Sequence, residues 1–167
     1  MSKLDAKLLK SLDELEIKLN ALLESPESLD KLWNTLDNNG NGIVSLAEID
    51  KFAIYTFPLL NNKPALMRAY KKTTSKDSNL SNGDDFVQKN EFPELVKNLF
   101  YFNRIYHVFG KIDSDNDKRL DLDEFKHSFN LLNLNKNLKP EYVFREIDTN
   151  NGGMILFDEF CEWYSKQ

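Results

Sequence analysis

Acidic side chains recur in residues 113–124 at the spacing of a cage for a hard cation. Carboxylates occupy the first, third, fifth, ninth and twelfth places of this segment: Asp113, Asp115, Asp117, Asp121 and Glu124. Calcium takes about six to eight oxygen ligands from such places, including a backbone carbonyl from the seventh, here Arg119. A Glu at the twelfth place binds through both carboxylate oxygens. The segment, called loop 3 from its place along the chain, therefore predicts a calcium site.

One residue of loop 3 departs from the pattern. Lys118 stands at the sixth place, where glycine is usual because the chain turns sharply there. A lysine that adopts a left-handed conformation costs about 1 kcal/mol. Because the direct carboxylate ligands offset this cost, we expect loop 3 to be the strongest site of the chain.

Two further segments, loop 1 (37–48) and loop 4 (148–159), repeat the spacing with fewer charges. In loop 1 the predicted ligands are Asp37, Asn39, Asn41, the Ile43 carbonyl and Glu48, with Gly42 at the turn. In loop 4 they are Asp148, Asn150, the Met154 carbonyl and Glu159, whereas Gly152 and Leu156 offer no side-chain oxygen. Since neutral amides attract a dication less than carboxylates do, we expect affinity to fall from loop 3 to loop 1 to loop 4.

A second repeat has lost part of the pattern. Glu91 precedes an apolar helix, as Glu124 does, but the residue eleven places earlier is Leu80, which cannot ligate a metal. The polar stretch before Glu91 carries Asp77, Asn79, Asn82, Asp84 and Asp85. We interpret this loop 2 as a longer pseudo-site that pairs structurally and binds metal poorly.

Apolar residues at helical spacing flank every loop, so the chain reads as four helix-loop-helix units, the EF-hand arrangement. We expect an all-α fold of two EF-hand pairs packed compactly, with an N-lobe at 26–102 and a C-lobe at 103–167. Paired loops meet through their eighth residues, so Val44 is predicted to face Val87, and Leu120 to face Ile155. Residues 1–25 form an additional amphipathic helix with a leucine stripe, ending at Ser25-Pro26: Leu4, Leu8, Leu12, Leu15, Leu19 and Leu22.

Composition argues against several classes of function. A net charge of -5 and the absence of a basic cluster disfavour nucleic acid. His107, His127 and Cys161 lie on separate helical segments without zinc-ligand spacing, and no nucleophile-base arrangement indicates an enzyme. No apolar run approaches the ~20 residues of a membrane span, and the N-terminus has neither a signal run nor a myristoylation glycine. We expect a cytoplasmic protein.

Residues 26–167 resemble the calmodulin superfamily over their whole length. Within that superfamily the runs 66–70, 113–119 and 157–163 resemble the flagellar calcium-binding proteins, or calflagins, and related protist EF-hand proteins. The resemblance implies a calcium sensor. Membrane attachment through N-terminal acylation is not implied, because Ser2 and Lys3 stand where the acylated Gly and Cys of calflagins would be.

The resulting hypothesis is a calcium sensor that changes conformation and recognises a protein partner, with Mg²⁺ as a competing ion. A calcium buffer that exposes no groove is the alternative, and a scaffold with Mg²⁺ or no ion in its loops is a third reading. Only three Met residues occur, which argues against a promiscuous Met-rich binding surface.

Overall fold

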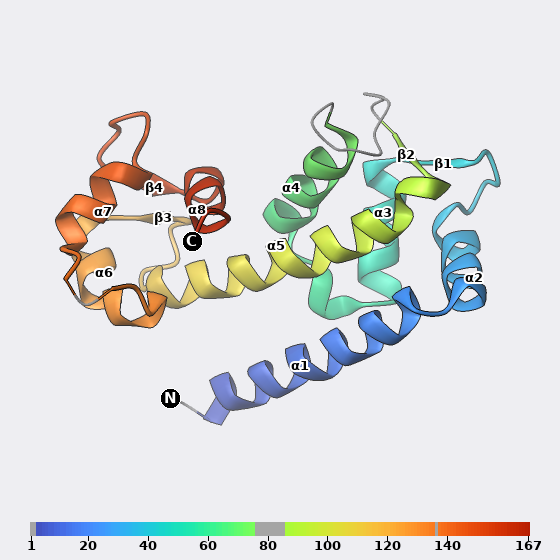
Figure 1. The fold of residues 1–167 in the computed structure, drawn as a ribbon, viewed down its shortest axis with the longest axis horizontal. Helices are drawn as coiled ribbons and strands as arrows, with labels where there is room; N and C mark the ends of the chain where they lie inside the picture. The colour runs from blue at the N-terminus through green and yellow to red at the C-terminus, as the bar shows by residue number, and fades with distance from the viewer. Residues whose placement is uncertain (1–2, 76–85, 136) are drawn as a thin grey trace. The chain divides into compact units, whose positions relative to one another are not determined.

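The computed structural model describes residues 3–75, 86–135 and 137–167, and Figure 1 shows their arrangement into helices and very short strands. The elements follow in the order α1 (Lys3–Leu23), α2 (Pro26–Leu36), β1 (Ile43–Val44), α3 (Leu46–Tyr55), α4 (Lys63–Thr74), β2 (Val87–Gln88), α5 (Phe92–Ile112), β3 (Arg119–Leu120), α6 (Leu122–His127), α7 (Pro140–Ile147), β4 (Ile155–Leu156) and α8 (Phe157–Tyr164). Short 3-10 turns lie at Pro58–Leu60, Lys89–Glu91 and Phe129–Leu132. The predicted all-α EF-hand fold is confirmed. None of the described helices combines the length and apolar character needed to cross a bilayer.

The chain divides into unit 1 (Met1–Arg104) and unit 2 (Ile105–Gln167), with the division inside α5. In each unit two hands are joined by a two-stranded antiparallel ladder between their loops. Val44 faces Val87 in unit 1 and Leu120 faces Ile155 in unit 2, as predicted. All four of these side chains are fully buried, so each ladder closes the top of an apolar core.

The start of α2 follows from local capping chemistry. The Ser25 hydroxyl accepts a hydrogen bond from the Ser28 N–H at 3.3 Å, and Pro26 occupies the first helical position. The helix buries Trp33, whose ring meets that of Phe92 edge-on at 5.5 Å between centroids. Helix α2 is thereby packed against the start of α5, the outgoing helix of the second hand.

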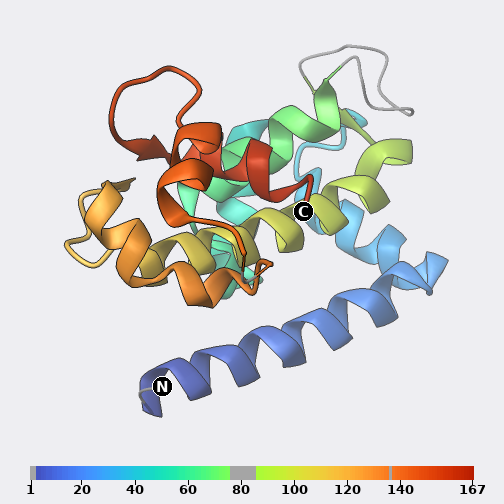
Figure 2. The same cartoon turned by 60° about the vertical axis from the view of Figure 1, so that its left-hand side comes forward.

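Helix α1 packs within unit 1 through its leucine stripe. Leu12, Leu15 and Leu19 are buried, whereas Ile17 on the other face is 70% exposed. The side chain of Leu4 lies outside the described part of the structure. Figures 1 and 2 show α1 on the side of unit 1 away from the β1–β2 ladder.

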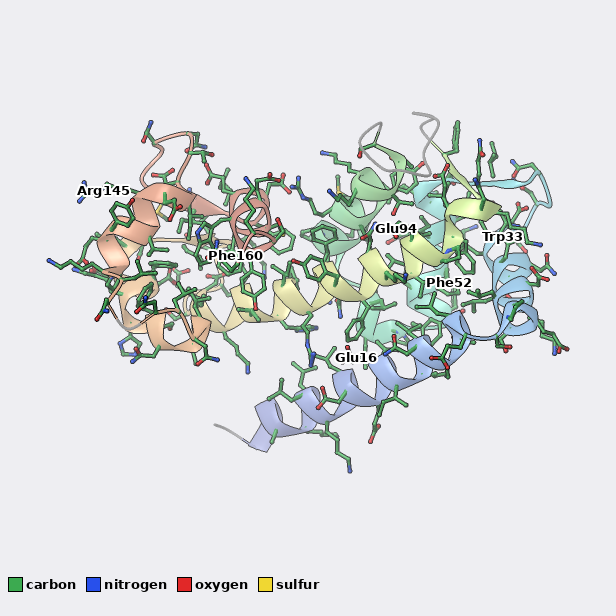
Figure 3. All side chains as sticks on the ribbon, in the orientation of Figure 1. Glu16, Trp33, Phe52, Glu94, Arg145 and Phe160 are labelled. Atoms are coloured by element: carbon green, nitrogen blue, oxygen red, sulfur yellow. The ribbon has the colours of Figure 1, made fainter. Side chains whose placement is uncertain are left out.

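Unit 2 has an aromatic core. The Phe125 and Phe144 rings lie 5.7 Å apart and those of Phe109 and Phe160 lie 5.5 Å apart, all in edge-on pairs. Phe160 is fully buried, whereas Arg145 on α7 is exposed. Figure 3 labels both side chains. Packed aromatic pairs of this kind stabilise a core beyond the area that they bury. They hold α5, α6, α7 and α8 in place around loops 3 and 4.

Candidate metal centre

Loop 3 begins where α5 ends, because Asp113 directly follows Ile112. Asp113 is 5% exposed, while Asp115 and Asp117 face solvent more freely. One oxygen from each of the three carboxylates lies within 4.8 Å of the others. These predicted ligands therefore converge on one point at the end of α5.

Backbone N–H groups fold loop 3 around its first carboxylate. Asp113 Oδ1 accepts from the Asp117 N–H at 3.2 Å, and its Oδ2 accepts from the Lys118 N–H at 3.0 Å. Asp115 Oδ1 also accepts from the Asp117 N–H, at 3.1 Å. The turn needs a left-handed residue at the sixth place, and Lys118 adopts it with φ of 69°. The conformation expected for Lys118 is confirmed.

Glu124 connects the two halves of loop 3. Its Oε1 accepts from the N–H of Ser114 at 2.9 Å and from that of Asp115 at 3.3 Å. Its Oε2 accepts from the Asp121 N–H at 3.0 Å, while Asp121 Oδ1 accepts from the Glu124 N–H at 2.8 Å. The last two bonds form a capping box at the start of α6. Glu124 thus contacts the beginning of the loop and also belongs to the first turn of α6.

The pKa of Asp115 reflects the clustering of negative charge in loop 3. The backbone hydrogen bond from Asp117 lowers the pKa of this carboxyl, but desolvation and the charges of Asp117 and Glu124 outweigh it, so the pKa is raised. A bound divalent cation would remove this mutual repulsion. The electrostatics of the loop therefore favour a cation among these carboxylates.

Loops 1 and 4 repeat the folding of loop 3 around their first residue. Asp37 accepts from the N–H groups of Asn41 and Gly42 at 3.2 and 2.9 Å. Asp148 accepts from those of Gly152 and Gly153 at 3.1 and 2.9 Å. Gly42 and Gly153 have φ of 82° and 81°, so glycine provides here the turn that Lys118 provides in loop 3.

The intermediate predicted ligands follow the same pattern in part. Asn39 Oδ1 accepts from the Asn41 N–H, and Asn41 Oδ1 accepts from the Ile43 N–H, each at 3.1 Å. Asn150 Oδ1 accepts from the Gly152 N–H at 2.8 Å. Met154 supplies only its backbone carbonyl to the predicted set, and its side chain is partly buried. Loop 4 keeps the fold of the binding loop with fewer side-chain oxygens.

The glutamates at the twelfth place differ between loops. Glu159 Oε1 accepts from the Asn150 N–H at 3.2 Å, and its Oε2 accepts from the Leu156 N–H at 3.0 Å, so it spans loop 4 as Glu124 spans loop 3. Glu48 Oε2 accepts from the N–H and hydroxyl of Ser45 at 2.9 and 3.1 Å. In the described part of the chain, no hydrogen bond joins Glu48 to the beginning of loop 1.

A cleft of about 600 Å³ lies beside loop 1, and Glu48 is part of its wall. The lining combines polar loop residues with apolar side chains from the neighbouring helices and from the residue before β2. The apolar members that are exposed to solvent are Tyr55 and Phe86, at 82% and 44%. Four predicted ligands of loop 1 therefore also line this cleft: Asn39, Asn41, Ile43 and Glu48.

Only the outgoing half of loop 2 belongs to the described residues. Glu91 is buried, at 1% exposure, in the 3-10 turn before α5. The acidic and amide residues expected in the preceding insertion lie outside the described residues: Asp77, Asn79, Asn82, Asp84 and Asp85. The reading of loop 2 as a pseudo-site stays a prediction.

Two contacts in loop 3 were not anticipated from the sequence. The guanidinium of Arg119, expected to contribute only its carbonyl, pairs with Asp117 at 3.3 Å. The hydroxyl of Ser114 donates to Glu124 Oε1 at 3.1 Å. An Arg placed two residues after an acid was the available signal for the first contact. No sequence pattern indicated the second.

Comparison with known proteins agrees with this geometry. A family model described as an EF-hand domain pair matches residues 102–165. The flagellar calcium-binding protein of Trypanosoma cruzi is 27% identical over 143 residues, which cover 81% of this chain and 68% of that protein. Flagellar calcium-binding protein TB-44A of Trypanosoma brucei brucei is 26% identical over 158 residues, covering 84% of this chain but 36% of that protein.

A homolog of programmed cell death 6 protein from Leishmania major Friedlin, known from a solved structure, is 21% identical with a TM-score of 0.42 and covers 81% of this chain and 72% of that chain. The repeated loop geometry and the matching family model show an EF-hand pair at residues 102–165, and over most of its length the chain is similar to the flagellar calcium-binding proteins.

Proposed function

We propose that the protein is a calcium sensor in which ions bound in loops 3, 1 and 4 move the outgoing helices and expose apolar surface to a protein partner. The ligands are the predicted oxygens of these loops, and the cytoplasm is the proposed location. The observation that carries the proposal is the double attachment of Glu124, to the beginning of loop 3 and to the first turn of α6.

Bidentate binding would change the contacts of Glu124. Both of its oxygens have to face the ion, so Oε1 gives up its hydrogen bonds from Ser114 and Asp115. Because Glu124 lies in the first turn of α6, we expect its carboxylate to draw that helix toward the ion when it binds. Ion binding is thereby converted into helix movement, as in EF-hand sensors that open on calcium binding.

Loop 1 offers a second route from ion to surface. Glu48 borders the cleft that also contains Phe52, Tyr55 and Phe86. When Glu48 turns to an ion, the wall of this cleft changes at the same time. A partner that inserts an apolar side chain there would be sensitive to occupancy of loop 1.

Magnesium is proposed as a weak competitor. It requires near-octahedral coordination and gives up its water reluctantly, so it does not need both oxygens of Glu124. Magnesium in loop 3 would therefore leave the contact between Glu124 and Ser114 largely in place. It would occupy the loop without moving α6.

Calcium titration of the full chain with a hydrophobic dye tests the proposal. We expect calcium to increase dye fluorescence and to shift the emission of the buried Trp33 and Trp163, and equal magnesium to do neither. Glu124→Gln should reduce the response, with Glu146→Gln, at an exposed position of α7 outside the loops, as the matched control. Normal calcium binding with a flat dye response would contradict the sensor and favour a buffer.

A further inference from the structure

Helix α1 is held in unit 1 by a compact set of contacts. Its buried residues Leu12, Leu15 and Leu19 are spaced i, i+3 and i+7, the pattern by which an amphipathic helix lies in a groove. The two hands of unit 1 are completed by α2, α3, α4 and α5 and joined by the β1–β2 ladder. Helix α1 is additional to this paired-hand unit.

A single arginine on α5, Arg104, forms ion pairs with two acidic side chains on the polar edge of α1. Arg104 Nη2 lies 2.8 Å from Asp13 Oδ1, and Arg104 Nη1 lies 3.4 Å from Glu16 Oε2. Figure 3 shows Glu16 on the side of α1 that faces α5. The guanidinium also lies over the Phe100 ring, 5.7 Å from its centroid, which limits its orientations. A planar guanidinium can engage two carboxylates at once, whereas a lysine ammonium is a point charge.

The ion pairs between α1 and Arg104 are suited to the replacement of α1 by another helix. Arg104, Asp13 and Glu16 have side-chain exposures of 40%, 62% and 43%, so solvent weakens their attraction in the bound state. The turn at Ser25 tethers α1 beside its site, and a tether of this length gives an effective concentration of about millimolar order. A tethered helix therefore stays bound with little intrinsic affinity, and a stronger free helix can replace it.

We propose that the surface beneath α1 is a binding site for an acidic amphipathic helix of a protein partner, and that α1 occupies it in cis. The partner helix carries apolar residues at i, i+3 and i+7 and acids at i+1 and i+4, which reproduces Leu12, Leu15, Leu19, Asp13 and Glu16. Arg104 favours a helix with acidic residues at i+1 and i+4 through the attraction between its guanidinium and their carboxylates. This docking does not depend on the proposed sensor function. Only a release of α1 triggered by calcium would depend on the sensor function. It would act through α5, which ends directly before Asp113.

Charge exchange in the full chain tests the site. The probe is a fluorescein-labelled peptide with the sequence of residues 3–24, and a second peptide has Lys in place of both acids that meet Arg104. In the protein variant Asp13→Lys/Glu16→Lys, α1 is repelled by Arg104 and the site becomes free. We expect this variant to bind the acidic peptide about tenfold more tightly than the wild type, measured by fluorescence anisotropy.

Two further variants make the experiment specific. Glu14→Lys/Glu24→Lys carries the same change of charge on two exposed residues, one on α1 and one directly after it, and should bind the acidic peptide like the wild type. Arg104→Glu should reverse the preference and bind the Lys-containing peptide. Each measurement is made with a calcium chelator and again with calcium. Peptide binding in chelator establishes the site, and the difference between the two conditions reports the sensor function separately.

Three outcomes would overturn the proposal. The first is equal peptide affinity in the Asp13→Lys/Glu16→Lys variant and its matched control. The second is unchanged peptide preference in Arg104→Glu. The third is loss of the helical circular dichroism signal in Asp13→Lys/Glu16→Lys, because that would show α1 to be an indispensable part of the core.

Discussion

The guanidinium of Arg119 lies 3.3 Å from the carboxylate of Asp117, and both residues belong to the predicted ion-binding set of loop 3. Asp117 is the fifth residue of the loop and Arg119 the seventh, whose backbone carbonyl is the expected ligand. Loop 3 therefore has a cationic side chain at one of its own ligands. An incoming calcium ion has to compete with it for Asp117.

We predict that Arg119→Gln increases the calcium affinity of loop 3 by about two- to fivefold, since exposed ion pairs of this kind contribute up to ~1 kcal/mol. Glutamine keeps a polar, though shorter, side chain and removes its charge. The measurement is isothermal titration calorimetry at low and high salt, and the gain should shrink as salt screens the pair. Lys118→Gln removes the same charge from the adjacent residue, whose ammonium contacts Asn116. An equal gain in calcium affinity in both variants would show that the overall charge of the loop, and not the Arg119–Asp117 pair, causes the effect.

We predict that substitutions of the glutamates at the twelfth place rank the three loops. Glu124→Gln should weaken the tightest calcium site by at least about tenfold, because a bidentate carboxylate becomes a neutral amide. Glu48→Gln should affect a weaker site, and Glu159→Gln the weakest. Calorimetry on the three matched variants measures the order. An unchanged tightest site in Glu124→Gln would show that the carboxylate count does not set the ranking.

Lys118→Gly should stabilise the calcium-free protein by up to about 1 kcal/mol. Lys118 has φ of 69°, where a side chain is strained and glycine is not, although greater freedom of the unfolded chain offsets part of the gain. Lys118→Ala keeps the strain while removing the charge and is the control. Urea unfolding in a chelator gives both values, and equal stability of the two variants would argue that the left-handed turn carries no cost.

The lowered pKa of His107 predicts that the protein loses stability at mildly acidic pH. Burial lowers the pKa of this imidazole from 6.5, and the charge of Lys111 lowers it further. The unfolded state then takes up a proton at a higher pH than the folded state does. His107 therefore contributes stability that is present above pH 6.5 and is lost as pH falls toward the folded pKa.

The contribution of His107 can be isolated by substitution. We expect His107→Gln to reduce the decline in unfolding free energy between about pH 7.5 and 5.5, measured with urea in a chelator. His127→Gln, at an exposed position of α6, is the matched control. A decline as steep in His107→Gln as in the wild type would assign the pH dependence to other groups.

Much of the fold was predictable because its determinants are local or repeated. Ser25 and Pro26 specify the start of α2 within three residues. The Asp113, Asp37 and Asp148 turns close over five residues, so the loop sequence alone is sufficient. Even the distant Val44–Val87 pair could be predicted, because counting loop positions in each repeat places both residues at the eighth place.

The sequence by itself determined the four-hand order, the predicted ligand spacing and the left-handed turn at Lys118, because each depends on neighbours along the chain. Tertiary structure alone decided how equivalent residues differ, as with Glu48, which borders a cleft, and Glu124, which spans its loop. It also decided that Arg104 meets Asp13, 91 residues away. Such a contact depends on how two helices pack, and the sequence of one helix does not specify which residue of the other helix it will meet.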